Sequence, residues 1–370
     1  MTSQIRRAPK MGGAPEPTLK YGDQFGPYII TGFAGSGATS YVYRARRKDR
    51  FEPVAIKVLH PHLVADPSRR LTFYREARIM MRIQHPNVVR FEEIIEDGDT
   101  LAFVMEYVDG MTLSQWRTSQ TEGIDEMTLA CVFVDVLRGV TAAHREGVVH
   151  RDLKPANILI TEEGGRAVAK MIDFGVARFV GEPLTERERK KITGTAAYIS
   201  PEEVGDPEQV GRSSDLYSIG VMLYEAACGR RPFEDVDVRS LLEAHVKEDP
   251  DRPRQLNPEL SSGMEQVILR TLQKNPSHRF GSAPEMIGAL EKALFEPMAN
   301  DEIEPELLEA TLEWSRAVER VEETRRKASL GRFFRRCLDA AFLLVASPGV
   351  NEKSDVHYLN RAGDASLPFR

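Results

Sequence analysis

The chain has 370 residues and a formal net charge of −6, with 41% hydrophobic and 29% charged residues. This balance is typical of globular proteins and argues against a protein built to coat nucleic acid. The length predicts one large two-lobed domain with extensions, or two mid-sized domains. Cys131, Cys228 and Cys337 are far apart and fit neither a disulfide framework nor a metal site. No signal peptide and no apolar run of about 20 residues for a transmembrane segment is found, so a cytoplasmic location is expected.

The N-terminal part of the sequence predicts a flexible leader followed by strands. Residues 1–27 are rich in proline and glycine without hydrophobic periodicity, which predicts a flexible leader. Apolar and aromatic segments begin at Tyr28–Ile30, which together with Tyr41–Tyr43 flanks a glycine-rich turn. Val54–Leu59 is a third apolar segment with one charge in its middle. These segments predict three strands.

A helix and two more strands complete this part. Asp66 is a plausible N-cap, with Pro67 in the first helical position, and apolar residues then recur at helical spacing until residues 85–86. Two further strands are expected around Val88–Ile95 and Leu101–Val108. This part is therefore mostly sheet with one helix.

Helical patterns dominate after residue 109. Apolar residues repeat at helical spacing from Leu129 to Val140, and Gly147 lies just beyond as a stop signal. Residues 215–228 are apolar on nearly every side. Such a helix belongs in the middle of a domain.

Two features of the first strands suggest phosphate binding. The turn that contains Gly35 and Gly37 would let backbone N–H groups approach a polyphosphate, although glycine-rich turns also arise for purely steric reasons. Lys57 interrupts an otherwise apolar strand, and Glu76 on the following helix is a candidate partner for it. A lone strand lysine is more often an edge or solvent-facing residue. Neither feature is decisive alone.

The decisive pattern is the run His150-Arg151-Asp152-Leu153-Lys154-Pro155-Ala156-Asn157, followed after sixteen residues by Asp173-Phe174-Gly175. The two motifs resemble the catalytic loop and the metal-binding turn of protein kinases. Lys154, two residues after Asp152, is typical of kinases that act on serine and threonine. The sequence is similar to the bacterial eukaryotic-like (Hanks-type) serine/threonine protein kinases.

The resemblance runs from about Tyr28 to Phe295 and implies an α+β bilobal protein-kinase fold. Residues 28–108 would form a small N-lobe, mainly antiparallel sheet with one helix. Residues 109–296 would form a larger, mainly helical C-lobe. Residues 297–370 would be a helical C-terminal extension with a disordered tail.

The resemblance also implies the roles of individual residues. Asp152 would orient the substrate hydroxyl and accept its proton, Lys154 would contact the transferred phosphate, and Asn157 and Asp173 would hold Mg²⁺. Glu76 would hold Lys57 against the phosphates. The residues implied to bind ATP are Gly35, Gly37, Val42, Ala55, Lys57, Glu106, Val108, Leu159 and Asp173.

Further matches concern residues that support the site. Asp215 matches the aspartate that braces the catalytic loop, and Arg279 matches the arginine that pairs with Glu202 at the end of the activation segment. Thr195 is expected to bridge Lys154 and Asp152. An apolar spine between the lobes is expected from Met80, Phe91, His150 and Phe174. Two positions depart from the family pattern, each keeping a small residue: Ser40 and Ser200.

Two other functions are consistent with parts of this pattern. A kinase-like binding protein without activity would be expected to lack Lys57, Asp152 or Asp173, and all three are present. A small-molecule phosphotransferase would lack the activation segment and the pair of Glu202 with Arg279. Protein substrates with serine or threonine acceptors, and no nucleic acid, are therefore the expected partners. Ala156 offers no carboxylate to bind an arginine that precedes the phosphorylated residue in a protein substrate.

Regulation is expected in two places. Autophosphorylation of Thr185 or Thr193 in the activation segment would provide a phosphate for Arg151. Residues 332–346 combine basic and apolar side chains, which suggests peripheral contact with an anionic membrane. The alternative is that the apolar side chains of this segment pack on the C-lobe. The sequence carries no signal for an oligomeric state.

Overall fold

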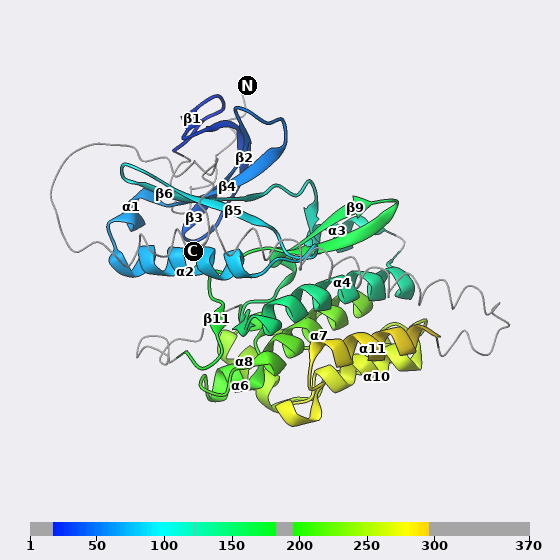
Figure 1. The fold of residues 1–370 in the computed structure, drawn as a ribbon. Coiled ribbons are helices and arrows are strands. Elements are labelled where there is room, and N and C mark those ends of the chain that lie inside the picture. The colour runs from blue at the N-terminus through cyan, green and yellow to red at the C-terminus, as the bar shows by residue number, and fades with distance from the viewer. Residues whose placement is uncertain (1–17, 122, 183–194, 296–370) are drawn as a thin grey trace, which may run out of the picture. The chain divides into compact units, whose positions relative to one another are not determined.

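The structure is a computed structural model that describes residues 18–121, 123–182 and 195–295. Its N-terminal half is one six-stranded antiparallel sheet with the strand order β1-β2-β3-β4-β6-β5, drawn in blue and cyan in Figure 1. The strands are β1 (Gln24–Phe25), β2 (Tyr28–Ser36), β3 (Ser40–Arg47), β4 (Pro53–Leu59), β5 (Phe91–Asp97) and β6 (Thr100–Glu106).

Two helices accompany this sheet, α1 (Pro61–Val64) and α2 (Pro67–Arg82). The predicted start of α2 is confirmed, because the Asp66 carboxylate accepts a hydrogen bond from the backbone N–H of Ser68 at 2.8 Å. The helix ends three residues earlier than the sequence suggested. Its buried face packs toward the sheet and carries Glu76 among apolar neighbours.

Two local predictions need correction. Residues 24–25, predicted to belong to a flexible leader, form β1, because burial of Phe25 and pairing with β2 stabilise them. Residues 88–90 are not part of β5. Val88 instead forms an isolated parallel bridge with Met171, and the N–H of Val89 donates to the Met171 carbonyl at 3.0 Å. Val88 and Val89, through their contacts with Met171, therefore join the two lobes.

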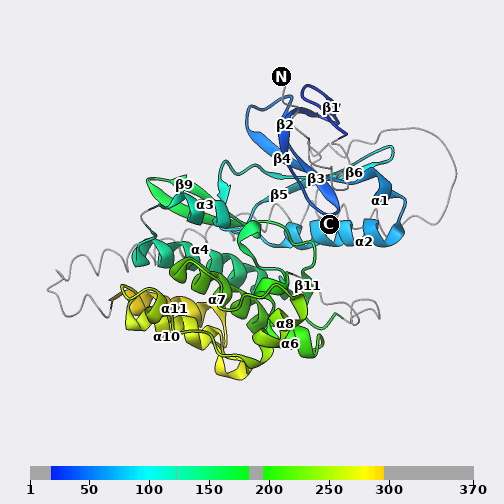
Figure 2. The ribbon, with the colours of Figure 1, turned by 180° about the vertical axis from the view of Figure 1, so that it is seen from behind.

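The C-terminal half is mainly helical, as predicted, and α4, α7, α10 and α11 pack together in it (Figures 1 and 2). The helices are α3 (Leu113–Ser119), α4 (Glu126–Arg145), α6 (Pro201–Gly205), α7 (Arg212–Cys228), α8 (Val238–Lys247), α9 (Pro253–Leu256), α10 (Ser262–Thr271) and α11 (Ala283–Phe295). Short 3₁₀ helices are η1 (Pro155–Asn157), η2 (Ala196–Tyr198) and η3 (Pro276–His278). The strands are β7 (Met111–Thr112), β8 (Val148–Val149), β9 (Ile158–Glu163), β10 (Arg166–Met171) and β11 (Arg178–Phe179).

Helix α4 lies at the centre of this half. It is the one helix among the described residues long and apolar enough to cross a membrane, and 67% of its apolar window is buried inside the fold. Gly139, in the middle of α4, allows close packing: a Cβ atom there would lie 2.8 Å from the Met171 sulfur and 2.9 Å from the Asn87 carbonyl oxygen. Core packing therefore accounts for the apolar character of α4.

Two small antiparallel sheets position the functional loops. One has the order β10-β9-β7, and the other pairs β11 with β8. Strand β8 ends one residue before His150, and β10 ends two residues before Asp173. Both motifs found in the sequence therefore begin where a strand ends.

Candidate active site

A group of three charged side chains joins the N-lobe to the turn Asp173-Phe174-Gly175. Strand β4 contributes Lys57, and helix α2 contributes Glu76; they are 8% and 5% exposed. The Lys57 ammonium lies 2.5 Å from Glu76 Oε1 and 3.1 Å from Asp173 Oδ1. The predicted pairing of Lys57 with Glu76 is confirmed. The structure adds Asp173 as a second partner of the same ammonium.

The protonation states of this group follow from its burial and its two carboxylates. Burial opposes the charge of Lys57, but the adjacent carboxylates outweigh it and raise the pKa of the ammonium. Burial also opposes the charge of Asp173, yet Lys57 lowers the pKa of this carboxyl to about 2. Burial, together with the charge of Asp173, raises the pKa of Glu76. Lys57 and Asp173 are therefore the firmly charged members.

The catalytic-loop residues form a second polar group. The Lys154 ammonium donates to Asp152 Oδ2 at 2.6 Å and to the Thr195 hydroxyl at 3.0 Å. The Thr195 hydroxyl donates in turn to Asp152 Oδ1 at 3.0 Å. The Asn157 side-chain amide donates to the Asp152 carbonyl at 2.8 Å. The predicted bridge by Thr195 is thus confirmed. Each carboxylate oxygen of Asp152 accepts a hydrogen bond, which fixes the orientation of this side chain.

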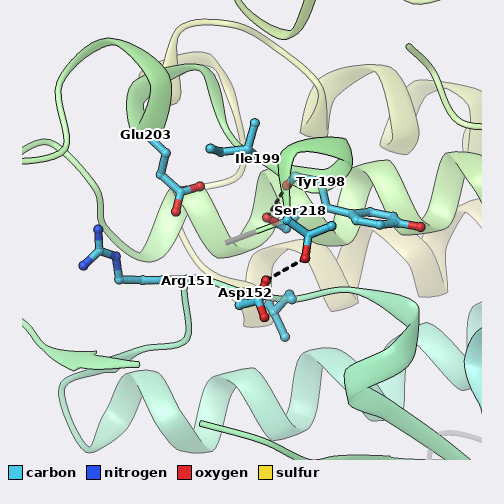
Figure 3. A pocket seen from close by; sticks show the side chains of 8 residues that line it. Arg151, Asp152, Tyr198, Ile199, Glu203 and Ser218 are labelled. Atoms are coloured by element: carbon cyan, nitrogen blue, oxygen red, sulfur yellow. Dashed lines mark hydrogen bonds between the residues drawn. The ribbon is translucent and has the colours of Figure 1, made fainter. Parts of the chain in front are cut away.

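A narrow crevice opens beside Asp152 (Figure 3). Arg151 and Asp152 lie on one side of it, and Ile199 and Glu203 on the other. Glu203 is 6% exposed; its Oε2 accepts hydrogen bonds from the backbone N–H and the hydroxyl of Ser200, each at 3.0 Å. Its other oxygen has no hydrogen-bond partner. Burial raises the pKa of Glu203 to about 7, although the Ser200 hydrogen bonds oppose the shift. The sequence offered no signal for this residue.

Asp215 holds the catalytic loop in a strained backbone conformation. Arg151 has φ of 66°, a left-handed value that is costly for a side chain other than glycine. The two oxygens of the buried Asp215 accept hydrogen bonds from the backbone N–H groups of His150 and Arg151, both at 2.9 Å. A ring nitrogen of His144 lies 2.8 Å from the same carboxylate. The predicted bracing contact is therefore present, and His144 is a partner that the sequence analysis missed.

The pair predicted at the end of the activation segment is also present. Arg279 donates to both oxygens of Glu202, each at 2.8 Å, and the Ser214 hydroxyl donates to Glu202 Oε1 at 2.7 Å. Burial opposes the charge of Glu202, but the Arg279 guanidinium lowers the pKa of this carboxyl. The pair fixes α6 against the start of α7.

The residues of the expected spine belong to the main core that both lobes share. Met80, His150 and Phe174 are at most 1% exposed, and Phe91 packs against the same core. The rings of His150 and Phe174 lie 4.8 Å apart. Helix α2 is thus packed through apolar side chains onto the segment that carries Asp173.

Several residues implied to bind ATP lie on or next to strands of both lobes. Val42 is on β3 and Ala55 on the adjacent β4, while Val108 follows β6 and Leu159 lies on β9. The Glu106 carboxylate accepts a hydrogen bond from Lys170 on β10 at 2.7 Å. This side-chain contact ties the end of β6 to the C-lobe, and the sequence analysis missed it because it depends on the fold. Gly35 and Gly37 lie in the β2–β3 hairpin, as predicted.

Helix α2 also contacts the segment after Asp173. Arg75, next to Glu76, donates to the Glu182 carboxylate. The Arg78 and Arg82 guanidinium groups lie 5.7 and 5.0 Å from the centre of the Phe179 ring. The predicted regulatory residues Thr185 and Thr193, and the whole extension 297–370, lie outside the described residues.

Comparison with known proteins agrees with this arrangement. The model of the protein kinase domain matches residues 28–290. A probable serine/threonine-protein kinase of Streptomyces coelicolor is 36% identical over 274 residues, which cover 73% of this chain and 40% of that protein. Serine/threonine-protein kinase PknB of Mycobacterium leprae is 36% identical over 265 residues, which cover 70% of this chain and 42% of that protein. The chain therefore spans less than half the length of these curated relatives.

A solved structure shows the same fold. The kinase domain of Mycobacterium tuberculosis PknI superposes with a TM-score of 0.57 at 24% sequence identity, covering 75% of this chain and 99% of that domain. The chain belongs to the protein kinase family, and its curated relatives are bacterial serine/threonine-protein kinases. The resemblance and the bilobal fold predicted from the sequence are thereby confirmed.

Proposed function

We propose that this chain transfers the terminal phosphoryl group of ATP to serine and threonine hydroxyls of proteins. The observation that carries the proposal is the hydrogen-bonded group of Asp152, Lys154 and Thr195. It places a carboxylate that can receive a proton beside an ammonium that can neutralise a phosphate. Phosphoryl transfer requires this combination of positioning and charge compensation.

Each residue has a distinct task in this proposal. Asp152 orients the acceptor hydroxyl for in-line attack and takes up its proton. Lys154, held beside Asp152, compensates the negative charge on the transferred group. Lys57, fixed by Glu76 and kept charged by two carboxylates, binds the phosphates of the nucleotide. The backbone between Gly35 and Gly37 covers them.

The residues present also fit Mg²⁺. Asp173 stays anionic because its pKa is about 2, and the amide oxygen of Asn157 is the atom left for a metal, since the amide nitrogen donates to the Asp152 carbonyl. Carboxylate and amide oxygens are ligands that Mg²⁺ prefers. When bound, Mg²⁺ would offset repulsion between phosphate oxygens. Among the described residues no group of three or more histidine, cysteine or acidic side chains is arranged to hold a metal.

A phosphate-transfer assay tests the function. The full chain, radiolabelled ATP, Mg²⁺ and a generic protein acceptor should give labelled phosphoserine or phosphothreonine, and Asp152→Asn should remove nearly all of it. Label in phosphotyrosine, or none at all with the wild-type chain, would contradict the proposal. Omission of Mg²⁺ should abolish transfer without unfolding the protein.

Regulation and location are part of the same proposal. We infer that the active chain is autophosphorylated on Thr185 or Thr193 and that Arg151 binds the new phosphate. Catalysis is proposed to take place in the cytoplasm, with residues 332–346 either in contact with an anionic membrane or packed on the C-lobe. Mass spectrometry of the active chain tests the first point, and liposome co-sedimentation of the chain with and without residues 297–370 tests the second.

A further inference from the structure

The tip of the β2–β3 hairpin is held by backbone hydrogen bonds. The Gly37 N–H donates to the Ser40 carbonyl at 2.8 Å and closes the turn. The backbone N–H of His60 donates to the Thr39 carbonyl, also at 2.8 Å. Residues 36–38 remain exposed to solvent, whereas Ser40 is buried. The base of the tip is therefore fixed, and its outer edge is open.

His60 also reaches the tip through its side chain. Its Nε2 lies 3.1 Å from the Gly37 carbonyl oxygen. The imidazole is only 3% exposed, and its ring meets Tyr41 edge-on at a centroid distance of 4.2 Å. His60 follows β4 directly and occupies the N-cap position of α1, so its backbone is held between a strand and a helix.

The chemistry of this contact defines which nitrogen carries a proton. A carbonyl oxygen only accepts, so Nε2 must donate to Gly37. The other ring nitrogen, Nδ1, is buried without a hydrogen-bond partner. A proton on Nε2 satisfies the Gly37 carbonyl, whereas an N–H group at Nδ1 would be buried without an acceptor. His60 thus binds the backbone of the tip as a single directed donor.

We propose that His60 is a positioning residue for phosphoryl transfer, holding the Gly37 end of the glycine-rich hairpin in the conformation that covers the ATP phosphates. This inference rests on the proposed function, because only a nucleotide phosphate gives the hairpin tip a ligand. Gly37 itself has no side chain to fix its position. A Cβ atom built at Gly37 would lie 3.8 Å from its nearest neighbour, the Ser40 carbonyl oxygen, so close packing does not fix this residue either. The directed hydrogen bond from a buried ring lowers the number of conformations open to the tip before ATP binds.

The test compares binding of ATP and of adenosine by the full chain in titration calorimetry. His60→Phe keeps a ring against Tyr41 but removes the donor, and His60→Gln restores a side-chain N–H donor. His62 stacks on the His60 ring at a centroid distance of 5.5 Å, so the control is His278→Ala, at an exposed histidine in η3. We expect His60→Phe to weaken ATP binding about fivefold, the change that corresponds to a net hydrogen bond of about 1 kcal/mol. Adenosine, which lacks phosphates, should bind unchanged, and His60→Gln should recover part of the ATP affinity.

Other outcomes separate failure of this inference from failure of the proposed function. Equal weakening of ATP and adenosine binding by His60→Phe, or no weakening of either, would overturn the positioning role while leaving the kinase function standing. A loss as large in His278→Ala would overturn it as well. Absence of ATP binding by the wild-type chain would instead contradict the proposed function itself.

Discussion

The two lobes each contain a buried ion pair, and the pairs differ in how completely they are satisfied. In the C-lobe, Glu202 receives two hydrogen bonds from Arg279 and one from Ser214, and its pKa is lowered. In the N-lobe, Glu76 shares the Lys57 ammonium with Asp173, and its pKa is raised. One cation with one carboxylate gives a rigid brace. One cation between two carboxylates leaves negative charge at Asp173 that can bind a further cation.

This difference indicates distinct purposes for similar residues. A fully satisfied buried pair supports the fold and has no capacity for another partner. The N-lobe group keeps an anionic Asp173 beside a charged Lys57, which suits a site that receives phosphates and a metal. Removing a residue from the first pair should therefore affect folding most, and removing one from the second should affect catalysis most.

The largest expected effect is that of Arg279→Leu. The side chain is fully buried, and its loss leaves the Glu202 carboxylate without its cation, at an expected cost of about 3–5 kcal/mol in the free energy of unfolding. Urea unfolding measures it. Arg230→Leu is the control, because Arg230 pairs with Asp251 on the surface and should contribute under about 1 kcal/mol. Equal losses in the two variants would contradict the comparison.

Lys57→Met should reduce kcat by about 10²–10³-fold, because it removes one well-placed electrostatic contact to the phosphates. Its effect on folding should be smaller than that of Arg279→Leu. The remaining Glu76, whose pKa is already raised, takes up a proton more readily than Glu202 does. Steady-state kinetics and urea unfolding on the same protein provide both values. Wild-type turnover in this variant would refute the assigned role of Lys57.

Glu203, adjacent to Glu202 in sequence, allows a test by pH. Burial raises its folded-state pKa from 4.5 to about 7, so the folded state binds the proton more tightly than the unfolded state. Its favourable contribution is therefore complete below pH 4.5 and lost as the pH rises through about 7. Glu203→Gln, which keeps an oxygen for Ser200, should gain about 2 kcal/mol relative to wild type between pH 5 and pH 8.

The matched control for this pH experiment is Glu259→Gln, because Glu259 is exposed. Its stability difference from wild type should be the same at both pH values. A pH-independent difference for Glu203→Gln as well would show that the Glu203 carboxyl titrates normally in the folded protein.

The smallest effect is expected at the ion pair of Arg75 with Glu182, whose side chains are 24% and 37% exposed. Glu182→Gln should destabilise the protein by under about 1 kcal/mol, since solvent screens a pair of this exposure. The loss should shrink further in 1 M NaCl. Thermal unfolding at low and high salt measures it, and a salt-independent loss would point to packing instead of charge.

Some features were accessible to sequence reasoning because they depend on local chemistry. Asp66 and Pro67 determine where α2 begins, whatever the rest of the chain does. The order and spacing of the residues around Asp152 and Asp173 were sufficient to indicate the family, since few other chemistries use that combination. The catalytic and metal-binding roles proposed for Asp152, Asn157 and Asp173 come from the same motifs, whereas the residues proposed to bind the nucleotide come from the wider resemblance to the family.

Other features depended on which distant segments meet. The sequence assigned residues 88–90 to a strand because they are apolar, but their neighbour is Met171, and this contact makes them a junction between the lobes. His60 and Glu203 are unremarkable in the sequence, because a lone histidine or glutamate has no fixed role until its surroundings are known. Burial and geometry decide whether such a group is solvated, paired or left with one unsatisfied atom, and only the tertiary structure supplies both.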